Sequence, residues 1–205
     1  MNGKGKTLER RKMTVSEFLG SAACRRLLIQ AAYCVIGVAC SQGIVFGRYA
    51  PFGVAAVAAA PYANLWPTLA GAVLGYLLPS SAQIPVRYIA AVLAAAAIRW
   101  TLNDLVKIRQ HPFFAPLISF APLFSTGVAL AMVNGTPSGG IAMYVAESLL
   151  GSGCSYFFSR TAERMGKSGA FRALKYPDQV SLAMTAGVLV VWPPGISVMG
   201  ISFGR

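Results

Sequence analysis

The sequence predicts an all-α membrane protein: a polytopic helix bundle of about six to seven hydrophobic segments, with the N-terminus in the cytoplasm. Hydrophobic residues make up 56% of the 205 residues and charged residues only 12%, whereas a soluble domain carries about 25% charged residues. Apolar runs approaching or exceeding the thickness of a membrane recur along the chain. The lysines and arginines, which give a net charge of +12, lie between and beside those runs, as the positive-inside bias predicts.

The same charge pattern indicates the class of partner. Cations that flank apolar runs favour anionic lipid headgroups over nucleic acid, so we expect a lipid bilayer and no nucleic acid as partner. The four cysteines show no Cys-x-x-Cys spacing, and His111 is the only histidine. The sequence therefore predicts no zinc site and no cofactor site in this chain.

The chain is expected to divide into a basic cytoplasmic tail, residues 1–26, and a transmembrane helical domain, residues 27–205. The first span is predicted at Leu27–Gly47, whose 21 residues suffice to cross the bilayer. Small residues spaced by four, which provide a flat strip for a neighbouring helix, occur at Gly43 and Gly47 and again at Gly71 and Gly75. We interpret both pairs as helix-packing surfaces.

The stretch that organises the chain is 47–79, which is almost wholly apolar but interrupted by four prolines. Each interior proline removes an amide donor and clashes with the preceding turn. The result is a proline-broken central pair, predicted at Phe52–Tyr62 and Leu65–Leu78. Helices of those lengths reach roughly 17 Å and 21 Å, against about 30 Å of hydrocarbon. Two tilted short spans or a re-entrant hairpin both fit, and both return the chain to the side from which it came.

Four further hydrophobic segments follow the central pair. The loop 103–112 and the basic segment 159–178 are expected on the cytoplasmic side, and the uncharged loop 134–140 on the outer side. This topology places fifteen of the eighteen lysines and arginines toward the cytoplasm: seven in the tail, three in the stretch from Arg99 to His111 and five from Arg160 to Lys175. Only Arg48, Arg87 and the terminal Arg205 are expected on the outer side. The segments are predicted at Val86–Leu102, at Phe113–Val133 with a bent or delayed start, at Ile141–Phe158, and at Gln179–Phe203 with a break at Pro193–Gly195.

Three polar residues inside the apolar runs are candidate intramembrane sites: Gln42, Arg99 and Glu147. A carboxylate at membrane depth is costly unless it is protonated or paired, so Glu147 suggests either a functional group or a hydrogen bond within the bundle. For the second case the expected partners are Gln30, Gln42 or Arg99. We favour the structural role, because no second intramembrane acid is available to form a proton relay.

Four short motifs lie between residues 47 and 100: GRYAPFGVA at 47–55, LAGAVLGYLL at 69–78, RYIAA at 87–91 and IRW at 98–100. They resemble the membrane region of the stage II sporulation protein E family, and the resemblance extends from about Arg25 to at least Phe158. It implies about ten spans in the bacterial plasma membrane, self-association, and a cytoplasmic linker that works with a tubulin-like protein at the asymmetric division septum.

The family also carries a C-terminal metal-dependent serine phosphatase domain. The resemblance implies that this phosphatase dephosphorylates an anti-anti-sigma factor and so activates a forespore sigma factor. Such chemistry needs clustered aspartates that hold paired cations. The chain has only Asp104 and Asp178, each in a basic loop, and it ends at Arg205. We therefore expect a chain truncated at its C-terminus that is not itself an enzyme, with a divalent metal only in the missing domain.

The leading hypothesis is thus a membrane anchor and assembly domain of a sporulation phosphatase. The alternative is a small transporter or substrate-binding membrane subunit, because such sites use broken helices and polar residues such as Gln42 and Glu147. Against it stand the lack of an inverted repeat and the single buried acid. An intramembrane enzyme is the weakest alternative, since Ser148, Ser152 and Ser155 have no histidine partner in any span.

Overall fold

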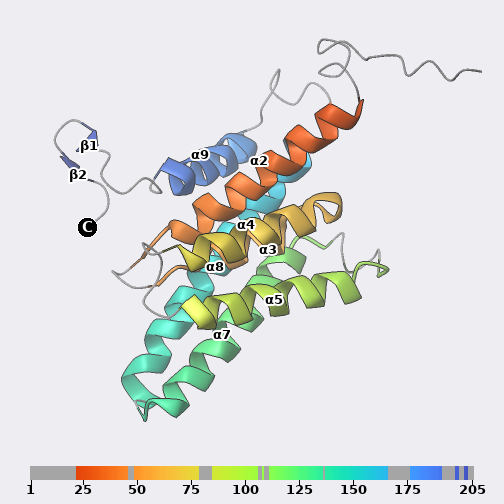
Figure 1. Cartoon of the computed structure of the whole chain (residues 1–205). Coiled ribbons are helices and arrows are strands. Elements are labelled where there is room, and N and C mark those ends of the chain that lie inside the picture. The colour runs from red at the N-terminus through yellow and green to blue at the C-terminus, as the bar shows by residue number, and fades with distance from the viewer. Residues whose placement is uncertain are drawn as a thin grey trace, which may run out of the picture.

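The computed structural model describes residues 22–45, 49–78, 85–105, 108, 111–135, 137–165, 176–190, 197–198 and 201–202. These residues form an α-helical body (Figure 1). The two-residue strands β1 and β2 pair antiparallel beside it. The predicted all-α class is confirmed. The elements are α2 (Ala22–Gln42), α3 (Phe52–Ala59), the 3-10 helix η1 (Tyr62–Asn64), α4 (Leu65–Leu77), α5 (Pro85–Thr101), α7 (Phe114–Val133), α8 (Pro137–Met165), α9 (Tyr176–Val190), β1 (Ser197–Val198) and β2 (Ile201–Ser202).

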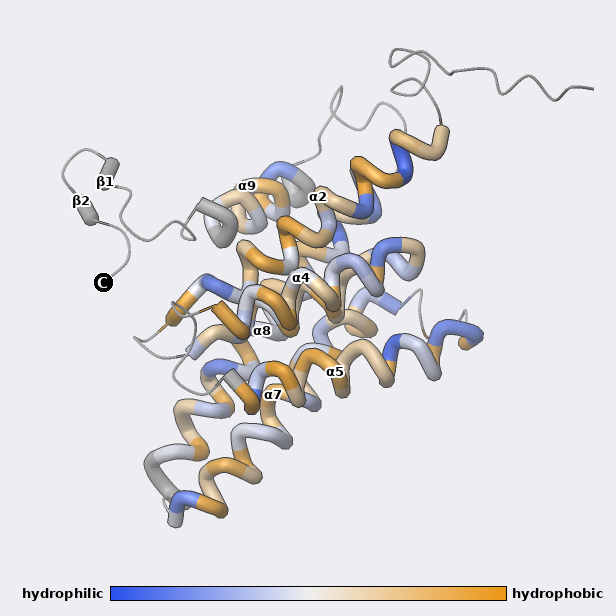
Figure 2. The backbone as a smooth tube through the Cα atoms, viewed as in Figure 1, coloured by the Kyte–Doolittle hydropathy of each residue, from blue (hydrophilic) through white to orange (hydrophobic). Residues whose placement is uncertain are grey.

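Within the described residues, two helices are long and apolar enough to cross a membrane. These are α2 with 21 residues and α7 with 20 residues, each about 30 Å long at about 1.5 Å per residue. Figure 2 shows apolar residues along the middle of the helices, and hydrophilic residues at the start of α2 and at the tip of the α7–α8 hairpin. These two helices give weak support to a membrane protein. The six to seven hydrophobic segments remain a prediction.

The central stretch is broken where the prolines predicted a break. The residue before Pro61, Ala60, has an extended backbone (ψ 141°), because the proline ring disfavours helical geometry in its predecessor. Helix α3 therefore ends at Ala59, three residues before its predicted end. Its eight residues and the 13 of α4 extend about 12 Å and 20 Å.

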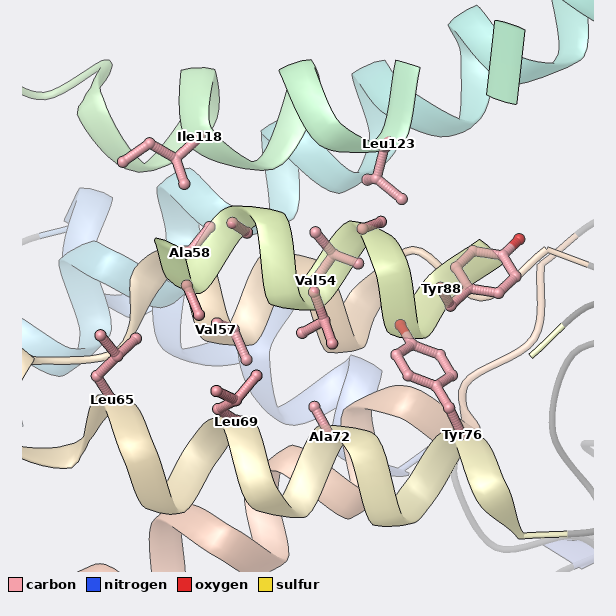
Figure 3. Packing of buried hydrophobic residues seen from close by; sticks show 14 of the residues in the cluster. Val54, Val57, Ala58, Leu65, Leu69, Ala72, Tyr76, Tyr88, Ile118 and Leu123 are labelled. Atoms are coloured by element: carbon pink, nitrogen blue, oxygen red, sulfur yellow. The ribbon is translucent and has the colours of Figure 1, made fainter. Parts of the chain in front are cut away.

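Helix α3 lies at the centre of the bundle, and all eight of its residues are buried. Figure 3 shows side chains of α4, among them Leu65 and Leu69, pointing toward Val54 and Val57 of α3, while Leu123 of α7 approaches from the opposite side. A helix that is apolar on every face needs neighbours on every side. Helices α2, α4, α5, α7 and α8 supply those neighbours.

The α3–α4 hairpin brings the chain back to the end of the bundle where α2 finishes. The amide of Gln42, the last residue of α2, donates to the carbonyl of Gly75 near the end of α4. Helices α2 and α4 therefore run parallel, and α3, which comes between them in the sequence, runs in the opposite direction. The chain thus returns to one end of the bundle, as both predicted arrangements of the central stretch require.

Several predicted boundaries were wrong by a few residues. Helix α2 begins at Ala22 and ends at Gln42 instead of spanning Leu27–Gly47, so residues 22–26, assigned to the tail, belong to the helix. After Gln42 the chain turns, with the amide of Gly43 donating to the Cys40 carbonyl at 3.2 Å. The ends of the apolar run Leu27–Gly47 therefore coincide with neither end of α2.

The last two helices also differ from their predicted ranges. Helix α8 is 29 residues long and exceeds the predicted Ile141–Phe158 at both ends. At its C-terminal end the helix continues because the arginine and glutamate residues after the apolar run are themselves good helix formers. Helix α9 ends at Val190, well before the predicted Phe203. The predicted break at Pro193–Gly195 lies outside the described residues. Helix α7 begins at Phe114, with Pro116 in its first turn and Pro122 inside it.

Candidate functional site

Glu147 of α8 is completely buried and forms an ion pair with Arg87 of α5. Arg87 Nη2 lies 2.7 Å from Glu147 Oε2, and the two side chains are 5% and 0% exposed. The hydroxyl of Tyr88 donates to Glu147 Oε1 at 2.6 Å. Both carboxylate oxygens thus have a partner, which is the condition under which a protein interior tolerates a carboxylate.

Arg87 makes further contacts that connect three helices. Its Nη2 donates to the Leu123 carbonyl of α7 at 3.1 Å, and its Nη1 donates to the Tyr88 hydroxyl at 3.2 Å. The guanidinium also lies over the Tyr144 ring of α8, 4.5 Å from its centroid. Gly127 of α7 permits this approach, because a Cβ there would lie 2.8 Å from the Tyr144 ring.

Two tyrosines extend this network to the beginning of α3. Tyr88 accepts a hydrogen bond from the Ala50 amide at 3.1 Å, and Tyr76 of α4 donates one to the Ala50 carbonyl at 2.7 Å. The two rings stack with centroids 5.2 Å apart (Figure 3). Both backbone polar groups of Ala50 are thereby satisfied, although the residue is fully buried. We call Arg87, Glu147, Tyr88 and Tyr76 the buried polar network.

Arg99 of α5 holds the opposite end of α3. Its Nη1 donates to the carbonyl of Ala58, one of the last four carbonyls of the helix, which have no partner within it. A cation at a helix C-terminus is also favoured by the helix dipole. The guanidinium lies 6.0 Å from the centroid of the Phe114 ring. Arg99 and the buried polar network together position the two ends of the central helix.

The predicted partners of Glu147 were wrong. Gln30 is exposed on α2, Gln42 donates to Gly75, and Arg99 caps α3. The actual cation, Arg87, stands at the start of an apolar run, where an arginine is expected at the membrane interface. An ionised acid at membrane depth needs a partner, and a cation is the strongest one, which was the signal that could have identified Arg87.

The glycines predicted as packing surfaces lie at helix contacts where they are described. A Cβ on Gly71 would sit 2.0 Å from the Cys34 carbonyl oxygen, and one on Gly75 would sit 2.0 Å from Ser41 Oγ. Both glycines of α4 therefore face α2. Gly43 lies against the ring of Phe52, and Gly47 lies outside the described residues.

The buried polar network is a cross-link between helices. Glu147 has both oxygens bonded, and of the Arg87 nitrogens only Nε lacks a partner. In the described part of the chain, no three histidine, cysteine, aspartate or glutamate side chains come together in a way that suits a metal ion. The serines considered above bond to carbonyls of their own helix, Ser148 to Tyr144 and Ser155 to Ser152.

Comparison with known proteins identifies no relative: no family model, no curated protein and no solved structure matches this chain.

Substitution of Tyr88 by phenylalanine should lower the free energy of unfolding by about 1–3 kcal/mol, because Glu147 Oε1 and the Ala50 amide would both lose a buried partner. The measurement is reversible unfolding in mixed detergent micelles, followed by circular dichroism. Tyr144→Phe is the matched control, since it keeps the ring beneath Arg87 and should have a smaller effect. Equal effects of the two substitutions would show that the Tyr88 hydroxyl does not stabilise the fold.

Proposed function

We propose that this chain is a membrane anchor and assembly domain. The observation that supports it best concerns the buried polar network, in which the carboxylate finds its partners inside the bundle. Glu147, the one carboxylate that is buried among the residues whose burial is described, is bonded at both oxygens to Arg87 and Tyr88. Intramembrane acids that move protons or bind substrates face a water-filled cavity or an ion pathway. An acid engaged at both oxygens is suited instead to holding helices in a fixed arrangement.

The membrane arrangement we propose has six to seven hydrophobic segments. Helices α2, α5, α7 and α8, each of 17 residues or more, cross the bilayer. The α3–α4 hairpin enters it and returns, since its helices have eight and 13 residues, fewer than the roughly 17 that a span needs. The end of the bundle where α2 begins faces the cytoplasm, as the basic residues favour. The sequence placed Arg87 on the outer side, but its side chain lies inside the bundle. The outer face therefore carries fewer cations than the predicted topology gave it.

The role we propose follows the resemblance to stage II sporulation protein E. In that role the bundle places a cytoplasmic partner at the asymmetric division septum of a sporulating bacterium and self-associates there. The catalytic chemistry, with its divalent metal, belongs to a phosphatase domain that the 205 residues do not contain. The short family-like motifs at 47–55 and 69–78 support the proposal, and both lie at or beside the central α3–α4 hairpin.

A fusion experiment tests the proposal. A fluorescent protein joined to the cytoplasmic N-terminus should follow the chain to the membrane fraction, resist alkaline extraction, and collect at the asymmetric septum during sporulation. The same fluorescent protein fused to residues 1–21 alone is the matched control and should stay soluble. A full-length fusion removed by alkaline wash would contradict membrane anchoring. A fusion spread evenly around the cell would contradict the septal role.

A flux measurement separates the anchor from the transporter. In proteoliposomes, wild-type protein and Glu147→Gln should show the same low proton permeability, because the carboxylate serves packing in the anchor. A pH- or ion-coupled flux that the wild-type protein supports and Glu147→Gln lacks, with the helical content unchanged, would favour the small transporter.

A further inference from the structure

A partly open cavity of about 210 Å³ lies between α2, α3, α4, α8 and α9 and includes no residue of the buried polar network. Its wall is predominantly apolar, formed by side chains such as Ile29, Ile36, Ala56 and Phe158. An engineered apolar cavity of about 150 Å³ stays dry and binds small hydrocarbons. A cavity of this size and lining therefore favours a hydrocarbon occupant over water.

The length of the cavity matches one leaflet of a bilayer. Along α2 its wall runs from Ile29 to Cys40, which corresponds to about 16 Å at about 1.5 Å per residue. The hydrocarbon core is about 30 Å thick, so one leaflet measures about 15 Å. A single acyl chain lying parallel to α2 has the required length.

Cations from two helices stand at one end of this cavity. Arg25 and Arg26 precede the cavity residue Ile29 by four and three positions on α2, and Arg164 follows the cavity residue Thr161 by three positions on α8. Residues three or four apart share a helix face, so these arginines lie on the faces that line the cavity. Positive charge at the end of an apolar slot suits an anionic headgroup attached to a hydrocarbon chain.

We propose that this cavity binds one acyl chain of an anionic phospholipid from the cytoplasmic leaflet, with the phosphate contacted by Arg25, Arg26 and Arg164. The inference rests on the membrane location given under the proposed function. The bound chain fills the space between α2 and α9. At its edge α9 joins the bundle through a contact of 3.2 Å between the hydroxyls of Thr161 and Thr185. The lipid thereby helps to hold α9 against the bundle.

The test is native mass spectrometry of the full chain extracted from membranes that contain equal amounts of phosphatidylglycerol and phosphatidylcholine. The wild-type protein should retain one phosphatidylglycerol per chain. Ala162→Phe, which fills the cavity from α8, should lower that occupancy at least tenfold. Leu149→Phe is the matched control, because Leu149 is exposed on the same helix outside the cavity, and it should leave the occupancy unchanged.

Two further variants keep the proposal falsifiable if Ala162→Phe does not fold. Ala32→Phe fills the cavity from α2 and should have the same effect as Ala162→Phe. The combined Arg25→Gln, Arg26→Gln and Arg164→Gln variant should lose the preference for phosphatidylglycerol over phosphatidylcholine.

Three outcomes would overturn the proposal: unchanged occupancy in both filled variants, an unchanged lipid preference in the glutamine variant, or loss of a protein dimer when the cavity is filled. The last outcome would identify a second copy as the occupant. If the chain remains in the membrane after alkaline wash while lipid occupancy is unchanged, only the cavity proposal fails. A chain released by that wash would instead contradict the anchor.

Discussion

Replacement of Arg87 by methionine should lower the free energy of unfolding by about 3–5 kcal/mol, the largest effect expected of any single substitution here. Methionine approximates the length of the arginine stem but leaves Glu147, which is fully buried, without its cation. The Leu123 carbonyl loses a donor as well. Reversible unfolding in mixed detergent micelles, followed by circular dichroism, measures the change.

The double variant Arg87→Met, Glu147→Met tests whether Arg87 stabilises the fold through its ion pair with Glu147 or only through the volume of its side chain. Removing both charges leaves no unpaired ion, and apolar replacements of buried ion pairs are commonly neutral or stabilising. The double variant should therefore recover most of the stability that Arg87→Met loses. Glu163→Met, at an exposed position of α8, is the control for loss of a charged side chain as such. A double variant no more stable than Arg87→Met would contradict the role assigned to the ion pair.

Alanine substitutions at Gly71 and Gly153 should change stability in opposite directions. A Cβ on Gly71 would lie 2.0 Å from the backbone oxygen of Cys34, so α2 and α4 must move apart, at a cost of about 1–3 kcal/mol. Gly153 is exposed within α8, and a Cβ there meets no atom within 4 Å. Alanine at that position should stabilise the helix by about 0.5–1 kcal/mol.

The same unfolding assay measures both glycine variants. Because each substitution adds one methyl group to a helix, the pair separates helix propensity from helix packing. Equal stabilisation by the two alanines would mean that α2 and α4 do not approach as closely as the structure places them. Destabilisation by both would mean that the surface around Gly153 is itself a contact.

The break in the central stretch was predictable because its cause is local. Pro61 disfavours helical geometry in the residue directly before it, so the end of α3 was placed to within three residues. The return of the chain, after α4, to the end of the bundle where α2 finishes agrees with both arrangements predicted for the central stretch. Helix ends that continue into polar residues, as α8 does beyond Phe158, were missed because charged residues can extend a helix without any apolar pattern.

The partner of Glu147 was not predictable from local signals. In the sequence, Arg87 stands 60 residues away and has the flanking residues of an ordinary interfacial arginine. Only the packing of α5 against α7, and of α7 against α8, turns that side chain inward and brings the carboxylate to it. The same holds for Tyr76 and Tyr88, which meet at Ala50 from two different helices.

The sequence by itself determined the class of the protein, the positions at which the apolar runs break, and the presence of a buried acid that needed a partner. Each of these follows from composition, charge order or the geometry of proline, which act over a few residues. The tertiary structure alone decided which cation pairs with Glu147 and at which helix contacts the glycines lie. It also decided where a cavity remains. These features depend on residues distant in the sequence, whose distances are set only when α3 is enclosed by its neighbours.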